Sequence, residues 1–271
     1  MKLSDLTLKE KLLDGKYLWK HRPDYSIKPN NAREEYAIRE LEKGYIYFSK
    51  PEDFNDPYDC FYGLAKPKCD EKKLRKYFQD RFPGSNRKER KEGAKILAST
   101  DGAEIIKNTE KAVIEKVGVA SFTISCGNQM MWSHYSNFHK GLCLGFNPNV
   151  DPLYFSHFGV NYLSKDEIVA YKPFEYDPTD TEQFQEAIMH IVSTKSFNWQ
   201  EEYERRIIRE QSGEYPFPPE SLEFVVFGWQ SEQKFIDKVR RAISENGNYR
   251  NVTIFKMSPS GNVFDLDFLK L

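Results

Sequence analysis

Residues 117–146, VGVASFTISCGNQMMWSHYSNFHKGLCLGF, decide the fold of this chain. Apolar residues dominate 117–125 and 141–146, and short apolar runs bounded by turn residues predict two buried β-strands. The Cys-Gly-Asn sequence at 126–128 predicts a turn, followed by a short helix over 129–135. The polar side chains between the two strands are therefore expected to gather at one end of a sheet.

The polar segment between these strands combines aromatic rings with hydrogen-bonding groups. Trp132, Tyr135 and His139 are predicted to bind a polar ligand that carries a ring, with His134 beside them. Ser133 and His134 do not form a nucleophile–base pair, because adjacent residues on a helix point in different directions. The alternative is a capped helix with half-buried aromatic rings.

Predicted strands and helices follow one another irregularly along the rest of the chain. Short strands are expected at 17–20 and 45–49, separated by a helix that Asn31 caps and Gly44 ends. A final strand is expected at 252–256. This mixture predicts an α+β fold: a mixed β-sheet with flanking helices, in which a split sheet is one arrangement.

A charged segment at about 65–115 is predicted to be an insertion of one or two helices in a single α+β domain that spans 1–271. Within 66–95, 12 Lys and Arg oppose 5 Asp and Glu, a net +7, so the remainder must carry −8 to give the chain its −1. Such a basic window is a candidate contact surface for nucleic acid. The alternative is a solvated helix face with charges paired at i,i+4.

The composition and the motifs exclude several classes of protein. Aromatic residues make up 15% of the chain, which is enough ring area for a packed core, so global disorder is not expected. No apolar run has the length of a transmembrane helix, and the N-terminus has no secretory-signal pattern. Four scattered Cys predict reduced thiols in a cytoplasmic protein and no metal site. P-loop, dinucleotide-fingerprint and zincin motifs are missing from the sequence.

The hexapeptide at 54–59, FNDPYD, follows the second predicted strand. Asn55 and Asp56 make it a candidate substrate-binding loop, because polar groups are packed here among aromatic rings. A tight turn is the alternative, since Asn and Asp side chains bond to nearby backbone and Pro fixes φ.

A third polar segment runs from Trp199 to Arg206. On a strand, Glu202, Glu204 and Arg206 would share one face, and such a line of charges is costly to bury unless the groups pair or bind something. A partly desolvated Glu202 or Glu204 is a candidate base or stabiliser of a developing cation. Surface salt bridging is the alternative.

The order of these segments resembles a bacterial family catalogued as domain of unknown function 2971, over roughly residues 17–257. The resemblance implies a shared fold and no particular activity. Tyr58 replaces a Phe of the family pattern, and His21 stands where an aromatic residue is usual. The matching motifs are Leu18 to Arg22, Tyr47-Phe48-Ser49, Phe54 to Asp59, Met131 to Gly141 and Trp199 to Arg206.

The chain also resembles, more distantly, the NAD-using folds of the ADP-ribosyltransferase type. That resemblance implies a split sheet that holds NAD, with His21 or Arg22 gripping ribose or phosphate from the first strand. Tyr47, Trp132 or Tyr135 would stack on nicotinamide. Glu202 or Glu204 would stabilise the cationic sugar that forms as nicotinamide departs.

These observations lead to three functional hypotheses. The first is an enzyme that cleaves or transfers from NAD or a related nucleotide, as a toxin or phage-defence effector. Its catalytic residues would be Glu202, Glu204, Arg22 and His134, with NAD as substrate and no metal. The second is a non-catalytic ligand- or nucleic-acid-sensing module that uses the basic segment 66–95. The third is a metal-dependent nuclease, for which Asp56, Asp59, Glu202 and Glu204 would converge on a cation.

Overall fold

The computed structural model describes residues 12–13, 15–27, 32–68, 70–249, 251–261 and 266–271. Within those residues, no helix is both long enough and apolar enough to cross a membrane. The helices are α2 (Tyr36–Lys43), α3 (Glu71–Arg81), α4 (Arg87–Leu97), α5 (Thr100–Ile114), α6 (Gln129–Tyr135), α7 (Lys165–Val169), α8 (Thr181–Val192) and α9 (Gln233–Glu245), with a 3₁₀ helix, η3, at Phe197–Glu202.

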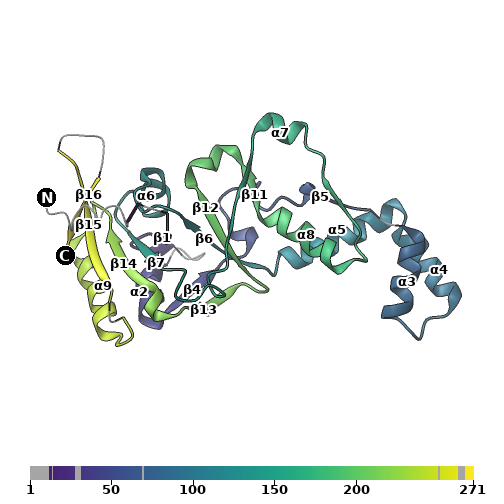
Figure 1. Ribbon diagram of the computed structural model, residues 1–271, viewed down its shortest axis with the longest axis horizontal. Helices are drawn as coiled ribbons and strands as arrows, with labels where there is room; N and C mark the ends of the chain where they lie inside the picture. The colour runs from purple at the N-terminus through teal and green to yellow at the C-terminus, as the bar shows by residue number, and fades with distance from the viewer. Residues whose placement is uncertain (1–11, 14, 28–31, 69, 250, 262–265) are drawn as a thin grey trace.

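The strands form one large mixed sheet and several two-stranded sheets, which confirms the α+β class (Figure 1). The large sheet has the order β16-β15-β14-β7-β1-β6-β12-β8, and the small ones pair β10 with β5, β11 with β9, β13 with β4, and β2 with β3. The strands are β1 (Leu18–Arg22), β2 (Ser26–Ile27), β3 (Arg33–Glu34), β4 (Tyr45–Phe48), β5 (Ala65–Pro67), β6 (Gly118–Thr123), β7 (Leu142–Phe146), β8 (Phe158–Gly159), β9 (Asn161–Leu163), β10 (Phe174–Tyr176), β11 (Thr194–Ser196), β12 (Glu204–Arg209), β13 (Gly213–Pro216), β14 (Leu222–Phe227), β15 (Thr253–Pro259) and β16 (Leu266–Lys270).

Helices α2 and α9 lie on one face of the large sheet, and α6 lies on the other. Leu41 of α2 and Val239 of α9 share a buried cluster with Leu144 and Phe227 of the sheet. On the opposite face, Trp132 of α6 belongs to the second buried cluster, together with sheet residues. Strand β1 is therefore covered on both faces, which is why this short strand is buried in the interior of the sheet.

The sheet opens between β1 and β6. Strand β1 pairs with β7 at five positions, from Leu18–Phe146 to Arg22–Leu142, but with β6 only at Trp19–Thr123. Beyond that pair, the side chains of Lys20 and Arg22 face a gap whose far side is formed by β6 and β12. This opening positions the candidate site described below.

A third buried cluster lies beyond β12 and joins α5 and α8. Strand β11 leaves the end of α8 and pairs with β9, in parallel, through Thr194–Asn161 and its two neighbours. Helices α3 and α4 extend from this part of the molecule as a helical hairpin (Figure 1). Their N-terminal ends are capped by Asp70 and Asn86, whose side chains accept backbone N–H groups.

Several predicted boundaries differ from the structure. The helix that ends at Gly44 begins at Tyr36, because residues 33–34 form β3 instead, and the proposed cap Asn31 lies outside the described residues. The charged insertion holds three helices, α3 to α5, where one or two were predicted. The strand at 252–256 is not the last, since β16 follows it.

Candidate functional site

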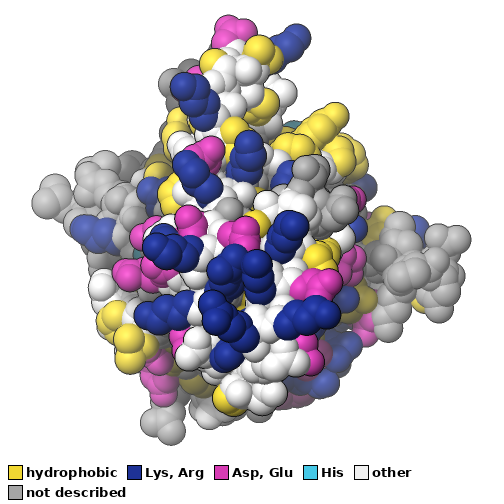
Figure 2. Space-filling model, turned by 90° about the vertical axis from the view of Figure 1, so that its right-hand side faces the viewer, with side chains coloured by type: hydrophobic (Ala, Val, Ile, Leu, Met, Phe, Trp, Pro, Cys, Tyr) yellow, Lys and Arg dark blue, Asp and Glu magenta, His cyan; other side chains and the backbone are white. Residues whose placement is uncertain are grey.

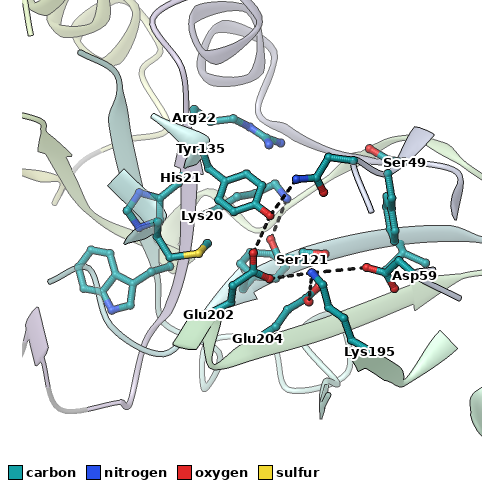
Figure 3. A pocket seen from close by; sticks show the side chains of 16 residues that line it. Lys20, His21, Arg22, Ser49, Asp59, Ser121, Tyr135, Lys195, Glu202 and Glu204 are labelled. Atoms are coloured by element: carbon teal, nitrogen blue, oxygen red, sulfur yellow. Dashed lines mark hydrogen bonds and ion pairs between the residues drawn. The ribbon is translucent and has the colours of Figure 1, made fainter. Parts of the chain in front are cut away.

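A cavity of about 170 Å³ lies at the opening of the sheet, between β1 and β6 (Figure 3). Polar side chains converge on it from separate parts of the chain: β1, the loop after β4, α6, β11 and the η3–β12 junction. Its lining residues include Lys20, His21, Arg22, Ser49, Asn55, Asp59, Ser121, Tyr135, Lys195, Glu202 and Glu204.

Lys195 is the centre of an ion cluster at the floor of this cavity. Its Nζ lies 2.7 Å from Glu202 Oε2, 3.1 Å from Glu204 Oε2 and 3.4 Å from Asp59 Oδ2, and all four side chains are almost fully buried. Burial alone would lower the pKa of Lys195, but the three carboxylates outweigh it and hold that pKa well above its ordinary value. Lys195 is therefore a permanent cation at neutral pH.

Arg206 closes the cluster from beneath the cavity. Its fully buried guanidinium donates from Nε and Nη2 to the two oxygens of Glu204 at 2.8 and 3.0 Å, from Nη2 to Asp59 Oδ2 at 2.8 Å, and from Nη1 to the Val192 carbonyl at 2.7 Å. Burial would raise the pKa of Glu204, but Arg206 and Lys195 lower it to about 2. These contacts join the loop at 54–59 to the segment at 199–206.

Glu202 is the carboxylate of the cluster that Arg206 does not bind. Its Oε1 accepts the hydroxyl of Tyr135 at 2.6 Å, and its Oε2 accepts Lys195. The side-chain amide of Asn55 lies 3.5 Å from the same tyrosine oxygen. Burial and the adjacent Glu202 raise the pKa of Tyr135, so the hydroxyl stays protonated and donates. Glu202 is thus held in a fixed orientation at the cavity wall.

The backbone at Tyr203 determines how the two glutamates meet at Lys195. The sequence predicted one continuous strand with Glu202, Glu204 and Arg206 on one face, but Glu202 ends η3, and β12 begins only at Glu204. Between them, Tyr203 adopts the left-handed conformation, with φ 46° and ψ 46°. This turn brings Glu202 to the same lysine as Glu204, although the two carboxylates do not share a strand.

Two basic residues of β1, Lys20 and Arg22, form the opposite wall. Lys20 Nζ donates to the Ser121 carbonyl at 3.1 Å and lies 4.9 Å from the centre of the Phe122 ring. Arg22 forms two 2.6 Å hydrogen bonds with the carboxylate of Glu40 on α2, and its side chain is 20% exposed. Arg22 therefore sits at the rim of the cavity, with its side chain partly open to solvent.

His21 lines the cavity from β1 but bonds away from it. Its Nδ1 lies 3.0 Å from Ser136 Oγ, and its ring stands edge-on to Trp132. Burial and the neighbouring His139 lower the pKa of His21 to about 3. The ring is therefore neutral at pH 7, so it cannot attract a phosphate by charge.

Three residues predicted for the site lie outside the cavity. Trp132 is fully buried, and its indole N–H donates to the Cys126 carbonyl, so it belongs to the core. His139 stacks on the Trp132 ring with 6.1 Å between centroids. His134 is exposed and faces the edge of Trp199. The segment 130–141 thus contributes Met131 and Tyr135 to the cavity and otherwise holds the helix on the sheet.

Tyr47 and Asp56 are also absent from the cavity lining. Tyr47 is 42% exposed on β4, which pairs with β13. Asp56 accepts the backbone N–H of Tyr58 and lines a neighbouring cavity on the other side of the loop. Asp59, Glu202 and Glu204 line the candidate-site cavity, whereas Asp56 lines only the neighbouring one, so the four acidic residues of the nuclease hypothesis do not share one cavity. Among the described residues, no group of three or more His, Cys, Asp or Glu is arranged to hold a metal ion.

Sequence reasoning missed Lys195, Lys20 and Ser121, and it named Asp59 only for a metal site. Lys195 is a single cation between a helix and an aromatic segment, and its partners are set by the pairing of β11 with β9. Lys20 was quoted within a motif, but nothing in the sequence shows that β1 and β6 separate beside it. The one available signal was the excess of carboxylates over cations in 199–206 and 54–59, which predicts that a further basic residue pairs with them if they are buried.

Residues 131–207 match a family described as protein of unknown function (DUF2971). This match confirms the family resemblance over this part of the chain. The matched span includes Tyr135, Lys195, Glu202, Glu204 and Arg206. No curated protein and no solved structure matches the sequence.

Proposed function

We propose that the cavity binds the nicotinamide–ribose end of NAD or a related nucleotide and that the protein cleaves or transfers from its glycosidic bond. The observation that supports this proposal is the placement of Glu202, which faces a cavity at an opening in the sheet and is oriented by Tyr135 and Lys195. Departure of nicotinamide leaves positive charge on the ribose, and a carboxylate fixed in advance stabilises that charge.

The size of the cavity restricts which part of a nucleotide enters. Ligand sites usually measure about 300–1,000 Å³, whereas this cavity measures about 170 Å³. A whole dinucleotide does not fit, so its phosphates would lie outside, at the rim that Arg22 forms. The remaining groups divide the roles: Tyr135 and Asn55 contact the substrate, while Glu204 and Arg206 hold the floor together.

Release of nicotinamide from NAD by the purified protein tests this proposal. We expect Glu202→Gln to reduce the rate by at least about 100-fold, a typical loss for one preorganised electrostatic group. The neighbouring Glu201 is exposed, so Glu201→Gln should leave the rate unchanged and is the matched control. No nicotinamide release by the wild type, together with no NAD binding by calorimetry, removes the proposal.

A second candidate function is supported by the hairpin of α3 and α4. Figure 2 looks onto this end of the molecule, and Lys and Arg side chains gather over its centre. Lys73 pairs with Asp177 and Arg75 with Glu71, so part of the charge is already neutralised. Exposed lysines remain on both helices at positions 72, 76, 88 and 91. This surface would bind a nucleic acid through its phosphates.

Salt-dependent retention of the full chain on RNA tests the second candidate. Replacing Lys72, Lys76, Lys88 and Lys91 by Gln should shift elution to lower salt, because each lost phosphate contact lowers the affinity for RNA. The control changes four exposed lysines elsewhere, at 43, 165, 172 and 234, to Gln. Equal shifts in both variants would show that only overall charge matters.

A further inference from the structure

The cavity contains two buried lysines whose surroundings are opposite. Lys195 contacts three carboxylates within 3.4 Å. Lys20, which is 5% exposed, donates to one neutral carbonyl, that of Ser121, and in the part of the chain that the structure describes no ion pair joins it to a carboxylate. Figure 3 shows the two amines on different walls of the same cavity. Two like groups held in such different environments are suited to different roles.

The charged groups that face Lys20 do not hold it as a cation. Burial, followed by the repulsion of Arg22, lowers the pKa of Lys20 well below its ordinary value. Glu40 and Glu204 attract a charge on Lys20, but Glu40 is already bound twice by Arg22, and Glu204 is bound twice by Arg206. The Phe122 ring offers the amine a weak cation site only.

We propose that Lys20 is a carbonyl-reactive nucleophile that forms an imine with a small aldehyde or ketone bound in this cavity. Its Nζ lines a space of about 170 Å³, which suits a molecule of a few carbon atoms. Its anchor is one hydrogen bond to the Ser121 carbonyl, which leaves the nitrogen lone pair free to attack. This inference does not depend on NAD cleavage.

The reaction conserves atoms and charge. The lone pair of the neutral Lys20 amine attacks the carbonyl carbon and forms a C–N bond, while the C=O π electrons move to oxygen. A proton passes from nitrogen to that oxygen and gives a carbinolamine. Loss of the hydroxyl group with the second N–H proton releases water and leaves the imine. The Tyr135 hydroxyl, which hydrogen-bonds Glu202, lies in the same cavity and can exchange these protons.

Reductive trapping on the intact chain tests the proposal. The protein is treated with glycolaldehyde and cyanoborohydride at pH 7, and the alkylation of each lysine is measured by peptide mass spectrometry. An ordinary lysine with a pKa of about 10.4 is almost wholly protonated at this pH, so we expect Lys20 to react at least about tenfold faster than exposed Lys72 or buried Lys195. From pH 7 to 9 the Lys20 rate should rise less steeply than the rate of an ordinary exposed lysine, which rises about tenfold per pH unit.

Two variants complete the test. Lys20→Arg removes the nucleophilic amine and places a permanent cation in the cavity, and Lys20→Met replaces Lys20 with an apolar chain of similar length. In both, the fast-reacting site should disappear while thermal unfolding remains cooperative. Labelling of Lys20 no faster than that of Lys195, or with the pH dependence of an exposed lysine, overturns the proposal. Because no nucleotide is present, this outcome is independent of the NAD assay.

Discussion

At the scale of single residues, Arg206 makes the contacts that hold the buried ion cluster together. Its guanidinium is fully buried and satisfies two carboxylates and a backbone carbonyl at once. Together, Arg206 and Lys195 oppose Asp59, Glu202 and Glu204, so the cluster has one carboxylate more than it has cations. A group this tightly paired is costly to remove, because its partners are then left charged and buried.

We therefore expect Arg206→Met to reduce the free energy of unfolding by roughly 3–5 kcal/mol, as for other broken buried ion pairs. Urea denaturation measures the change. Lys68→Gln is the control, since it breaks an exposed pair with Glu175 and should cost less than about 1 kcal/mol. A loss for Arg206→Met as small as that of the control would contradict the buried network.

His21 predicts how stability depends on acid. Its pKa is about 3 in the folded protein, against an ordinary value of 6.5, so the unfolded chain binds the proton more readily. The folded state should therefore lose stability as pH falls from 6.5 towards 3, by up to about 1.4 kcal/mol per pH unit. His21→Phe should make this part of the profile flatter, because the ring can still pack on Trp132 while Ser136 donates to the Leu142 carbonyl.

Urea denaturation at pH 7, 6, 5 and 4 measures the slope. The exposed His157 provides the control, and His157→Gln should leave the slope as in the wild type. An unchanged slope in His21→Phe would show that other groups produce the acid sensitivity.

At the scale of elements, the junction at Tyr203 aims the two glutamates. A left-handed conformation is costly for most side chains and most costly for β-branched ones. Tyr203 is half exposed, and its hydroxyl contacts only Glu201 at 3.3 Å among the hydrogen bonds described. Its backbone conformation therefore matters more than its ring.

Accordingly, Tyr203→Gly should keep or slightly raise the melting temperature, and Tyr203→Val should lower it by an amount that corresponds to about 1–3 kcal/mol. Differential scanning calorimetry of the two variants measures this. Equal melting temperatures for Gly and Val would mean that the junction changes conformation freely.

Elements defined by local signals could be predicted, and contacts between distant elements could not. Helix α6 has the predicted bounds, since Asn128 caps it and apolar strands flank it, and β7 lies within its predicted run at 141–146. The start of α2 was wrong because the backbone of Arg33 and Glu34 pairs with β2, a contact the sequence does not display. Lys195 was missed for the same reason. Its partners come from two segments, 54–59 and 199–206, which meet only in the folded chain.

At the scale of the whole molecule, the α3–α4 hairpin stands apart from the sheet (Figure 1). Among the described residues, Leu74 and Ala94 are the buried hydrophobic side chains of these two helices, and neither belongs to the three core clusters. The partly buried Leu97 at the end of α4 packs against the third cluster. The hairpin therefore contributes little to the main core. The position of the hairpin therefore suits the binding surface proposed above better than a role in stabilising the fold.

Replacing residues 71–97 with a flexible Gly/Ser linker should leave the melting temperature within a few degrees of the wild-type value, because few core contacts are removed. Calorimetry measures this, and trapping at Lys20 in the same variant shows whether the cavity is intact. Loss of cooperative unfolding would show that the hairpin supports the body of the protein.

The separation of β1 from β6 sets how the molecule can accommodate larger guests. Trp19–Thr123 is the one rung that joins the two halves of the large sheet in the described chain. A rotation of one half of the sheet about that pair would widen the cavity without breaking the backbone pairing of β1 with β7 or of β6 with β12. The size of ligand that can enter would then depend mainly on how easily the aromatic side chains packed around Trp19 rearrange, and less on the volume of the residues that line the cavity.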